Sequence, residues 1–127
     1  MSWQSYIDQT LLGSGRVKDA AIIGAGDGSI WATSPGMNLA AGEPANIVKL
    51  FSDPSLGPVN GIKVGTVKYM YLRGDNTSLY GKKGAGGCVC VKTAQCVVIG
   101  LYDENIQPGQ CAVTVEKLGD YLRDAGY

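Results

Sequence analysis

The sequence has no histidine among its 127 residues, so it lacks the side chain that most often acts as a base near neutral pH. It has no apolar run near the roughly 20 residues that a membrane-spanning helix needs. Residues 1–6 have neither the basic start nor the apolar stretch of a secretion signal. These absences argue against histidine-based catalysis, a histidine metal site and a membrane span, and we expect no metal and no cofactor.

Charged residues are also few, at 17%, and the 11 basic side chains balance the 11 acidic ones. The basic residues are unevenly placed, because the segment 63–92 contains six of them and a single acid, Asp75. A basic face on a neutral protein indicates an acidic partner, such as a protein surface, anionic lipid or nucleic acid. The alternative is a solvated sheet edge whose lysines discourage pairing with other edges.

The hydrophobic pattern predicts one domain over residues 1–127, with helices at both ends and antiparallel strands between them. Terminal helices are expected over 2–12, with Ser2 as the N-cap, and over 112–125, with a short helix from Pro44 to about 52. The segment 53–58 is expected to be a loop. The buried stripe of the last helix is expected to be Val115, Leu118, Leu122 and Ala125. Strands are expected over 18–24, 29–33, 62–64, 67–73, 78–81, 88–92 and 96–102.

The four cysteines do not have the spacing of a metal site or a CxxC motif. Cys88 and Cys90 share one face of a predicted strand, and Cys96 could lie across the hairpin from them. We interpret these residues and Cys111 as buried thiols that act as small apolar side chains. A redox-sensitive pair is the alternative, whereas a catalytic cysteine would lack a histidine base.

Seven tyrosines and two tryptophans outnumber the single phenylalanine. Trp3 and Tyr6 are neighbours on the first predicted helix, Trp31 lies on an early strand, and Tyr121 and Tyr127 lie near the end of the chain. If the terminal helices pack side by side on the sheet, the five rings could form one patch. Such a patch suits a proline-rich ligand, because rings stack on pyrrolidines while polar tips reach backbone carbonyls. The alternative is that the rings only seal the core.

Seven short motifs, in order along the whole chain, resemble the profilin family. They lie at 2–8, 21–32, 68–70, 81–87, 102–104, 108–111 and 115–122. The pattern is most similar to the plant, fungal and amoeboid branches of the family. The resemblance implies an α+β fold, an α-β-α sandwich with a central antiparallel sheet. Both terminal helices would pack on one face and the short helices on the other.

The resemblance also implies a function in binding rather than catalysis. Profilins bind monomeric actin, regulate its polymerisation and nucleotide exchange, and bind proline-rich proteins such as formins. They also bind phosphatidylinositol bisphosphate at the membrane surface. We therefore expect a monomeric protein of the cytoplasm and cytoskeleton that does not bind nucleic acid. Two alternatives stay open: a proline-binding module without strong actin binding, and a thiol redox protein.

The family's functional positions carry over to three sets of residues. The poly-L-proline site would comprise Trp3, Tyr6, Trp31, Tyr121, Leu122 and Tyr127. The actin surface would comprise Lys68, Arg73, Lys82, Lys83, Pro108 and Gly109. The phosphoinositide surface would comprise Lys63, Lys68, Arg73, Lys82 and Lys83.

Two questions about the actin surface remain at this point. Lys68 and Arg73 have opposite strand parity, so both can face one partner only if a bulge or a strand end separates them. Gly81 occupies a position where some members of the family carry a basic residue. Either Lys82 or Lys83 could replace that residue as the main actin contact.

Overall fold

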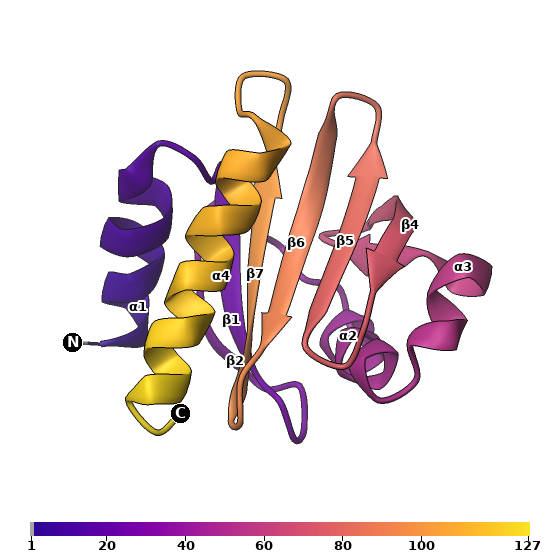
Figure 1. The fold of residues 1–127 in the computed structure, drawn as a ribbon, viewed down its shortest axis with the longest axis horizontal. Helices are drawn as coiled ribbons and strands as arrows, with labels where there is room; N and C mark the ends of the chain where they lie inside the picture. Colours follow the sequence, from indigo (N-terminus) through magenta and orange to yellow (C-terminus); the bar gives the residue numbers. More distant parts are fainter. Residues whose placement is uncertain (1) are drawn as a thin grey trace.

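The computed structural model describes residues 2–127, and Figure 1 shows the order of the elements. The helical segments are α1 (Trp3–Ser5), continued by a π-helix (Tyr6–Leu11) and a 3₁₀ turn (Leu12–Ser14), α2 (Glu43–Ser52), a 3₁₀ turn (Pro54–Leu56), α3 (Gly57–Asn60) and α4 (Pro108–Asp124). The strands are β1 (Asp19–Gly24), β2 (Ile30–Thr33), β3 (Ile62–Val64), β4 (Val67–Gly74), β5 (Ser78–Lys83), β6 (Gly86–Lys92) and β7 (Cys96–Tyr102). We call the continuous segment from α1 to the first 3₁₀ turn the N-terminal helix.

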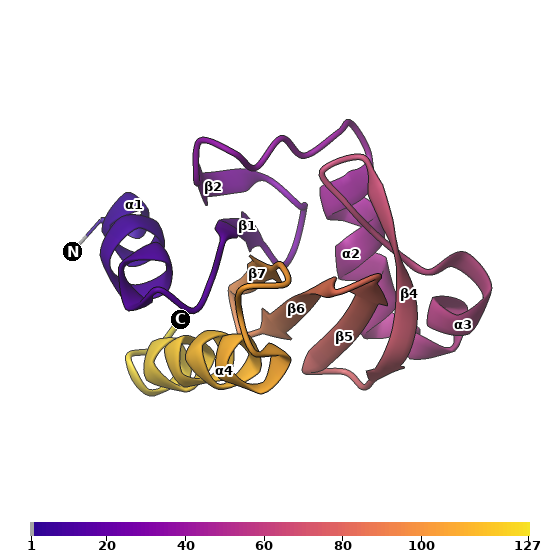
Figure 2. The same cartoon turned by 90° about the horizontal axis from the view of Figure 1, so that it is seen from above.

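The seven strands form one antiparallel sheet in the order β2-β1-β7-β6-β5-β4-β3. The N-terminal helix and α4 lie side by side on one face, whereas α2 and α3 lie at the other (Figures 1 and 2). Each face has its own core, one built on α4 and the N-terminal helix and the other on α2. The predicted α+β sandwich, with a sheet covered on both faces, is therefore confirmed.

The N-terminal helix begins as predicted, because the Ser2 hydroxyl accepts a hydrogen bond from the Ser5 N–H at 3.1 Å. It ends where glycine adopts a left-handed conformation, at Gly15 with φ of 73°. Its middle is a π-helix rather than the expected α-helix, yet Ile7 and Leu11 are both fully buried. The helix therefore still presents one apolar stripe to the sheet.

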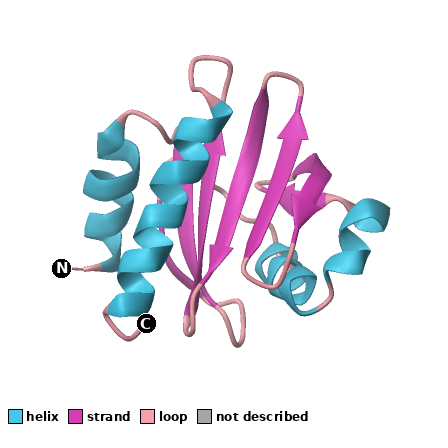
Figure 3. Ribbon diagram, viewed as in Figure 1, coloured by secondary structure: helices cyan, strands magenta, loops and turns pink. Residues whose placement is uncertain are grey.

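Two helical predictions are wrong. The segment 53–58, expected to be a loop, instead contains a 3₁₀ turn that begins at Pro54 and the start of α3, with Pro58 in its first turn (Figure 3). Both prolines stand in first turns, where the missing N–H costs no helical hydrogen bond. For the same reason α4 begins at Pro108, earlier than expected, so Cys111 joins its buried stripe and Ala125 is exposed.

Two glycines allow α4 to pack closely on the sheet. A Cβ atom at Gly119 of α4 would lie 2.6 Å from Val91 Cγ1, and one at Gly100 of β7 would lie 2.5 Å from Val115 Cγ2. Real Cβ atoms do not make contacts this short, so any side chain would force the helix away from the sheet. The position of α4, and of the residues it carries on its outer face, therefore depends on these two positions.

A buried carboxylate fixes the β3–β4 hairpin on the opposite face. Glu43, 6% exposed at the start of α2, accepts hydrogen bonds from the N–H groups of Ala40, Gly65 and Thr66 at 2.9, 2.8 and 2.8 Å. Gly65 and Thr66 form the two-residue turn of the hairpin, and both have positive φ, at 60° and 68°. The carboxylate therefore holds a turn that is strained at threonine.

Among residues 2–127, no helix is long and apolar enough to span a bilayer.

Candidate ligand-binding surfaces

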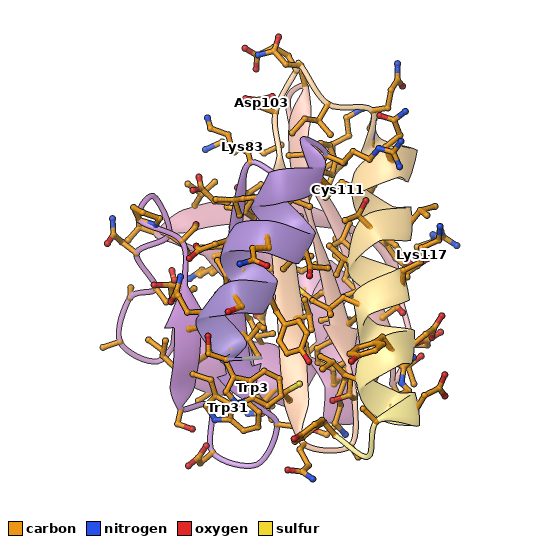
Figure 4. All side chains as sticks on the ribbon, turned by 90° about the vertical axis from the view of Figure 1, so that its left-hand side faces the viewer. Trp3, Trp31, Lys83, Asp103, Cys111 and Lys117 are labelled. Carbon is orange, nitrogen blue, oxygen red and sulfur yellow. The ribbon has the colours of Figure 1, made fainter. Side chains whose placement is uncertain are left out.

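The five predicted aromatic residues meet in one cluster, which we call the aromatic cluster. The Trp3 ring lies 5.7 Å from the Tyr6 ring, 4.8 Å from Trp31 and 5.1 Å from Tyr127, between centroids. Tyr6 in turn lies 6.1 Å from Tyr121. These separations are typical of direct aromatic contact. The N-terminal helix, β2, α4 and the last residue thus contribute to a single surface, and Figure 4 shows the two tryptophans together at one end of it.

Backbone hydrogen bonds hold Tyr127 in this cluster. Its N–H donates to the Leu122 carbonyl at 2.8 Å, which turns the chain back after α4. Its carbonyl oxygen accepts from the Thr93 hydroxyl at 2.9 Å and from the Gln95 N–H at 2.5 Å, both in the β6–β7 turn. The ring is therefore placed by the sheet, and its 41% exposure leaves a face for a ligand.

Leu122 differs from the other residues predicted for the poly-L-proline site. It is fully buried in the core between α4 and the sheet, so it presents no surface to a ligand. Its periodic position explains the difference, because it shares the inward stripe of α4 with Val115 and Leu118. Leu122 supports the aromatic cluster from below, while its neighbour Tyr121 is 55% exposed.

The cluster also offers hydrogen-bond donors at its surface. Burial first, and then the Tyr121 hydroxyl, raise the pKa of Tyr6 above its usual value, so the phenol stays protonated at neutral pH. The Trp31 indole N–H already donates to the Ser29 hydroxyl at 3.2 Å. The Trp3 indole N–H, in contrast, has no hydrogen-bond partner within residues 2–127.

A β-bulge resolves the parity problem on the basic face. Tyr71 of β4 pairs with Gly81 of β5, but Arg73 pairs with the adjacent Tyr80, so β4 contains one extra residue between them. The extra residue shifts the alternation of side chains by one position. Arg73 consequently lies on the same face of β4 as Lys68, as the predicted actin surface requires.

The alternation of side chains along β5 places two adjacent lysines on opposite faces. Arg73 places its guanidinium carbon 4.3 Å from the centroid of the Tyr80 ring, and the Tyr80 hydroxyl donates a hydrogen bond to Glu116 of α4. Lys82 lies two residues from Tyr80 on β5 and therefore shares this face. Lys83 points to the other face, where it lines a cavity together with Tyr69 and Tyr102. Lys82 rather than Lys83 thus belongs with Arg73.

The middle of α4 lies beside this face, because Glu116 joins it to β5 through Tyr80. Pro108 and Gly109 open the helix and are both exposed. Of the residues predicted for actin binding, Lys68, Arg73 and Lys82 therefore lie on one face of β4 and β5, whereas Lys83 lies on the other.

Two of the predicted phosphoinositide residues line one cavity. Lys63 and Lys68 pair across β3 and β4 and line a cavity of about 260 Å³. Arg73 lies five residues further along β4, roughly 16 Å away along the strand, and Lys82 pairs with Met70 between them. The same cavity is lined by Lys49 of α2, which the sequence analysis missed because it lies outside the basic segment.

The four cysteines are all buried, at 1% exposure or less. Cys88 and Cys90 face α2, whereas Cys96 and Cys111 belong to the core under α4, so the expected position of Cys96 across from the first pair is wrong. Burial raises the pKa of Cys96 and brings that of Cys111 to about 12, and the neighbouring Cys90 thiol raises that of Cys88. These thiols pack as small apolar groups, in contrast to reactive cysteines, whose pKa is depressed.

Comparison with known proteins agrees with this geometry. The family model for Profilin matches residues 1–127. Over 127 residues, which cover all of both chains, the sequence is 51% identical to Profilin-1 of Dictyostelium discoideum and 54% identical to Profilin-A of Physarum polycephalum. The crystal structure of Acanthamoeba castellanii profilin II superimposes with a TM-score of 0.95 at 44% identity, covering 99% of this chain and 100% of that one. The chain belongs to the profilin family.

Proposed function

We propose that this protein is a monomeric, non-enzymatic adaptor of the actin cytoskeleton in the cytoplasm. It binds monomeric actin and proline-rich proteins through two separate surfaces of one domain, residues 1–127, and so regulates polymerisation and nucleotide exchange on actin. Membership of the profilin family supports the assignment. The observation that carries it is the aromatic cluster, where four segments of the chain bring five rings into contact.

Two proteins that share the fold support the classes of ligand. Mouse profilin IIa, with a TM-score of 0.79 and 23% identity, has been solved in complex with a double repeat from the FH1 domain of mDia1. LokiProfilin2, with a TM-score of 0.79 and 20% identity, has been solved in complex with rabbit actin. At these identities the likeness concerns the fold, so the argument for each ligand depends on the surfaces of this chain.

The aromatic cluster binds a polyproline II helix by stacking. Pyrrolidine rings lie against Trp3, Trp31 and Tyr127, and the Trp3 N–H and Tyr6 hydroxyl donate to carbonyls that such a helix leaves without internal partners. The ligand is stiff before binding, and the Tyr127 ring is already fixed by Thr93 and Gln95. Little conformational entropy is therefore lost on either side.

The basic face of β4 and β5 binds monomeric actin. Lys68, Arg73 and Lys82 supply positive charge, and Met70, 62% exposed on the same face of β4, supplies apolar area. Apolar contact gives most of the affinity at such an interface, while the charges steer association. The face belongs to the β3 side of the sheet and the aromatic cluster to the β2 side, so the two ligands can be bound together.

We assign phosphatidylinositol bisphosphate binding to the cavity that Lys49, Lys63 and Lys68 line. Three lysines around one cavity suit an anionic headgroup, and each basic side chain near an anionic surface contributes about 1 kcal/mol. Because Lys68 also lies on the actin face, lipid and actin would compete for the protein.

The proposal is tested by titrating the protein with a proline decamer and following tryptophan fluorescence, first alone and then with monomeric actin bound. Trp3 and Trp31 are the only tryptophans, so the signal reports on the aromatic cluster. We expect a saturable change that persists when actin is bound. No saturable change would contradict the proline assignment, and displacement of the peptide by actin would contradict two separate surfaces.

A variant identifies the site. Trp3→Ala removes the ring that contacts three others and should weaken proline binding by roughly 30-fold or more, as expected for a central aromatic residue, measured by calorimetry. Arg73→Ala is the matched control, and it should weaken actin binding instead. If Trp3→Ala binds the decamer with unchanged affinity, the aromatic cluster is not the site.

A further inference from the structure

The aromatic cluster continues into a groove that it does not itself fill. A groove of about 460 Å³ lies between the N-terminal helix and α4, and its walls include Tyr6 and Tyr121 of the cluster. Beyond these rings the walls are Thr10 on one side and Thr114 and Lys117 on the other, with Leu118 in the floor. The proline surface therefore has an open extension along the helices.

The spacing of the side chains shows that the extension runs in line with the cluster. Trp3, Tyr6 and Thr10 are three and four residues apart on the N-terminal helix, so they lie along one face. Tyr121 and Lys117 are four residues apart on α4, which puts Lys117 about 6 Å further along the groove at the helical rise. Because a polyproline II helix advances about 3.1 Å per residue, this distance corresponds to about two residues of ligand.

The extension carries one charge and it is positive. Among the six residues that line the groove, Lys117 is the one basic residue and none is acidic. Within residues 2–127 the salt bridges join Lys18 to Asp103 and Arg123 to Asp120, so none of them uses the Lys117 ammonium. Figure 4 shows Lys117 on the outer side of α4, away from the end of the molecule where the two tryptophans lie.

We propose that this groove selects proline-rich ligands that carry an acidic side chain about two residues beyond the proline run. The carboxylate would bind the Lys117 ammonium at the rim, while the intervening residue lies against Tyr6, Tyr121 and Leu118. The inference rests on the proposed function, since the proline run must first occupy the aromatic cluster. It adds a preference for flanking sequence that the stacking surface cannot supply, because stacking on prolines does not depend on the charge of the residues beside them.

The test uses a proline decamer extended by Ala-Glu, a twin extended by Ala-Gln, and the same pair with the extension at the other end. All four are titrated by calorimetry at low salt and at high salt. We expect the glutamate peptide of one pair to bind about two- to fivefold more tightly than its twin, the range of an exposed ion pair, and the difference to vanish at high salt.

Three variants make the result specific. Lys117→Gln should abolish the difference within the pair and leave the affinity for the plain decamer unchanged. Lys117→Glu should reverse it, so that a peptide extended by Ala-Lys binds more tightly than the one extended by Ala-Glu. Arg16→Gln, at an exposed basic position just after the N-terminal helix that lines neither proposed site, is the control and should preserve the difference.

The outcomes separate this inference from the function on which it rests. Equal affinity for both members of both pairs, or a difference that survives in Lys117→Gln, overturns the inference and leaves proline binding intact. Failure of the plain decamer to bind overturns the proposed proline site and the inference together.

Discussion

The buried carboxylate of Glu43 allows a quantitative prediction about stability. Glu43→Gln changes little in volume but replaces one of the two oxygens that accept three backbone N–H groups with an N–H₂ donor. If the amide oxygen takes the place of Oε1, the bonds from Ala40 and Gly65 survive as neutral bonds, a loss of about 1 kcal/mol in all. The Thr66 N–H then faces another donor, which costs about 1–2 kcal/mol more.

The expected loss is therefore about 2–3 kcal/mol of unfolding free energy, or roughly 8–12 °C in Tm for a chain of this length. Urea denaturation followed by circular dichroism measures it, with an unchanged m-value showing that the denatured state is not altered. Glu104→Gln, at an exposed position, is the matched control and should stay within about 0.5 kcal/mol of the original protein. A loss below about 1 kcal/mol for Glu43→Gln would refute the view that the carboxylate holds the hairpin turn.

Two further predictions concern charged residues on the surface. Lys82→Glu should weaken binding to monomeric actin, whereas Lys83→Glu should change it little, because the two side chains lie on opposite faces of β5. A sedimentation or fluorescence assay measures both affinities. Equal effects of the two substitutions would contradict the assigned faces. Hydrogen bonds from Thr77 and then Ser78 lower the pKa of Asp75, so its stabilising effect is present above its unfolded pKa and lost as pH falls through the folded value. The difference in unfolding free energy between the original protein and Asp75→Ala should therefore become smaller from about pH 4 downwards. Thermal denaturation at a series of pH values measures this difference. A difference independent of pH would show that the Asp75 carboxylate does not stabilise the turn.

The strands and the aromatic cluster could be predicted from sequence because their signals are local. β3 and β7 have the predicted bounds, since apolar runs bordered by turn residues define both ends. Trp3 and Tyr6 share a helix face at a spacing of three. Their contacts with Trp31 and Tyr127 needed one further assumption, that the terminal helices pack side by side on the sheet, and the structure shows this packing.

The features that the sequence could not show depend on tertiary contacts. The bulge before Arg73 is a matter of register between two strands, and no residue type in β4 requires it. Lys49 joins Lys63 and Lys68 only because α2 packs beside the β3–β4 hairpin. The burial of Leu122 follows from periodicity, but the resemblance to a family does not separate a residue that contacts a ligand from one that supports it.

The pairing of β1 with β7 has a consequence for how the chain folds. Asp19 faces Leu101 and Gly24 faces Cys96, so forming this ladder closes a loop of roughly 70–80 residues. Relative to the tight β6–β7 hairpin, closing so long a loop costs about 2–3 kcal/mol more in chain entropy. During synthesis, the β1–β2 hairpin can join the rest of the sheet only after β7 has been made, because β1 pairs with β7. The topology therefore favours folding that is slow for the length of the chain and completed late, once most of the chain has been made.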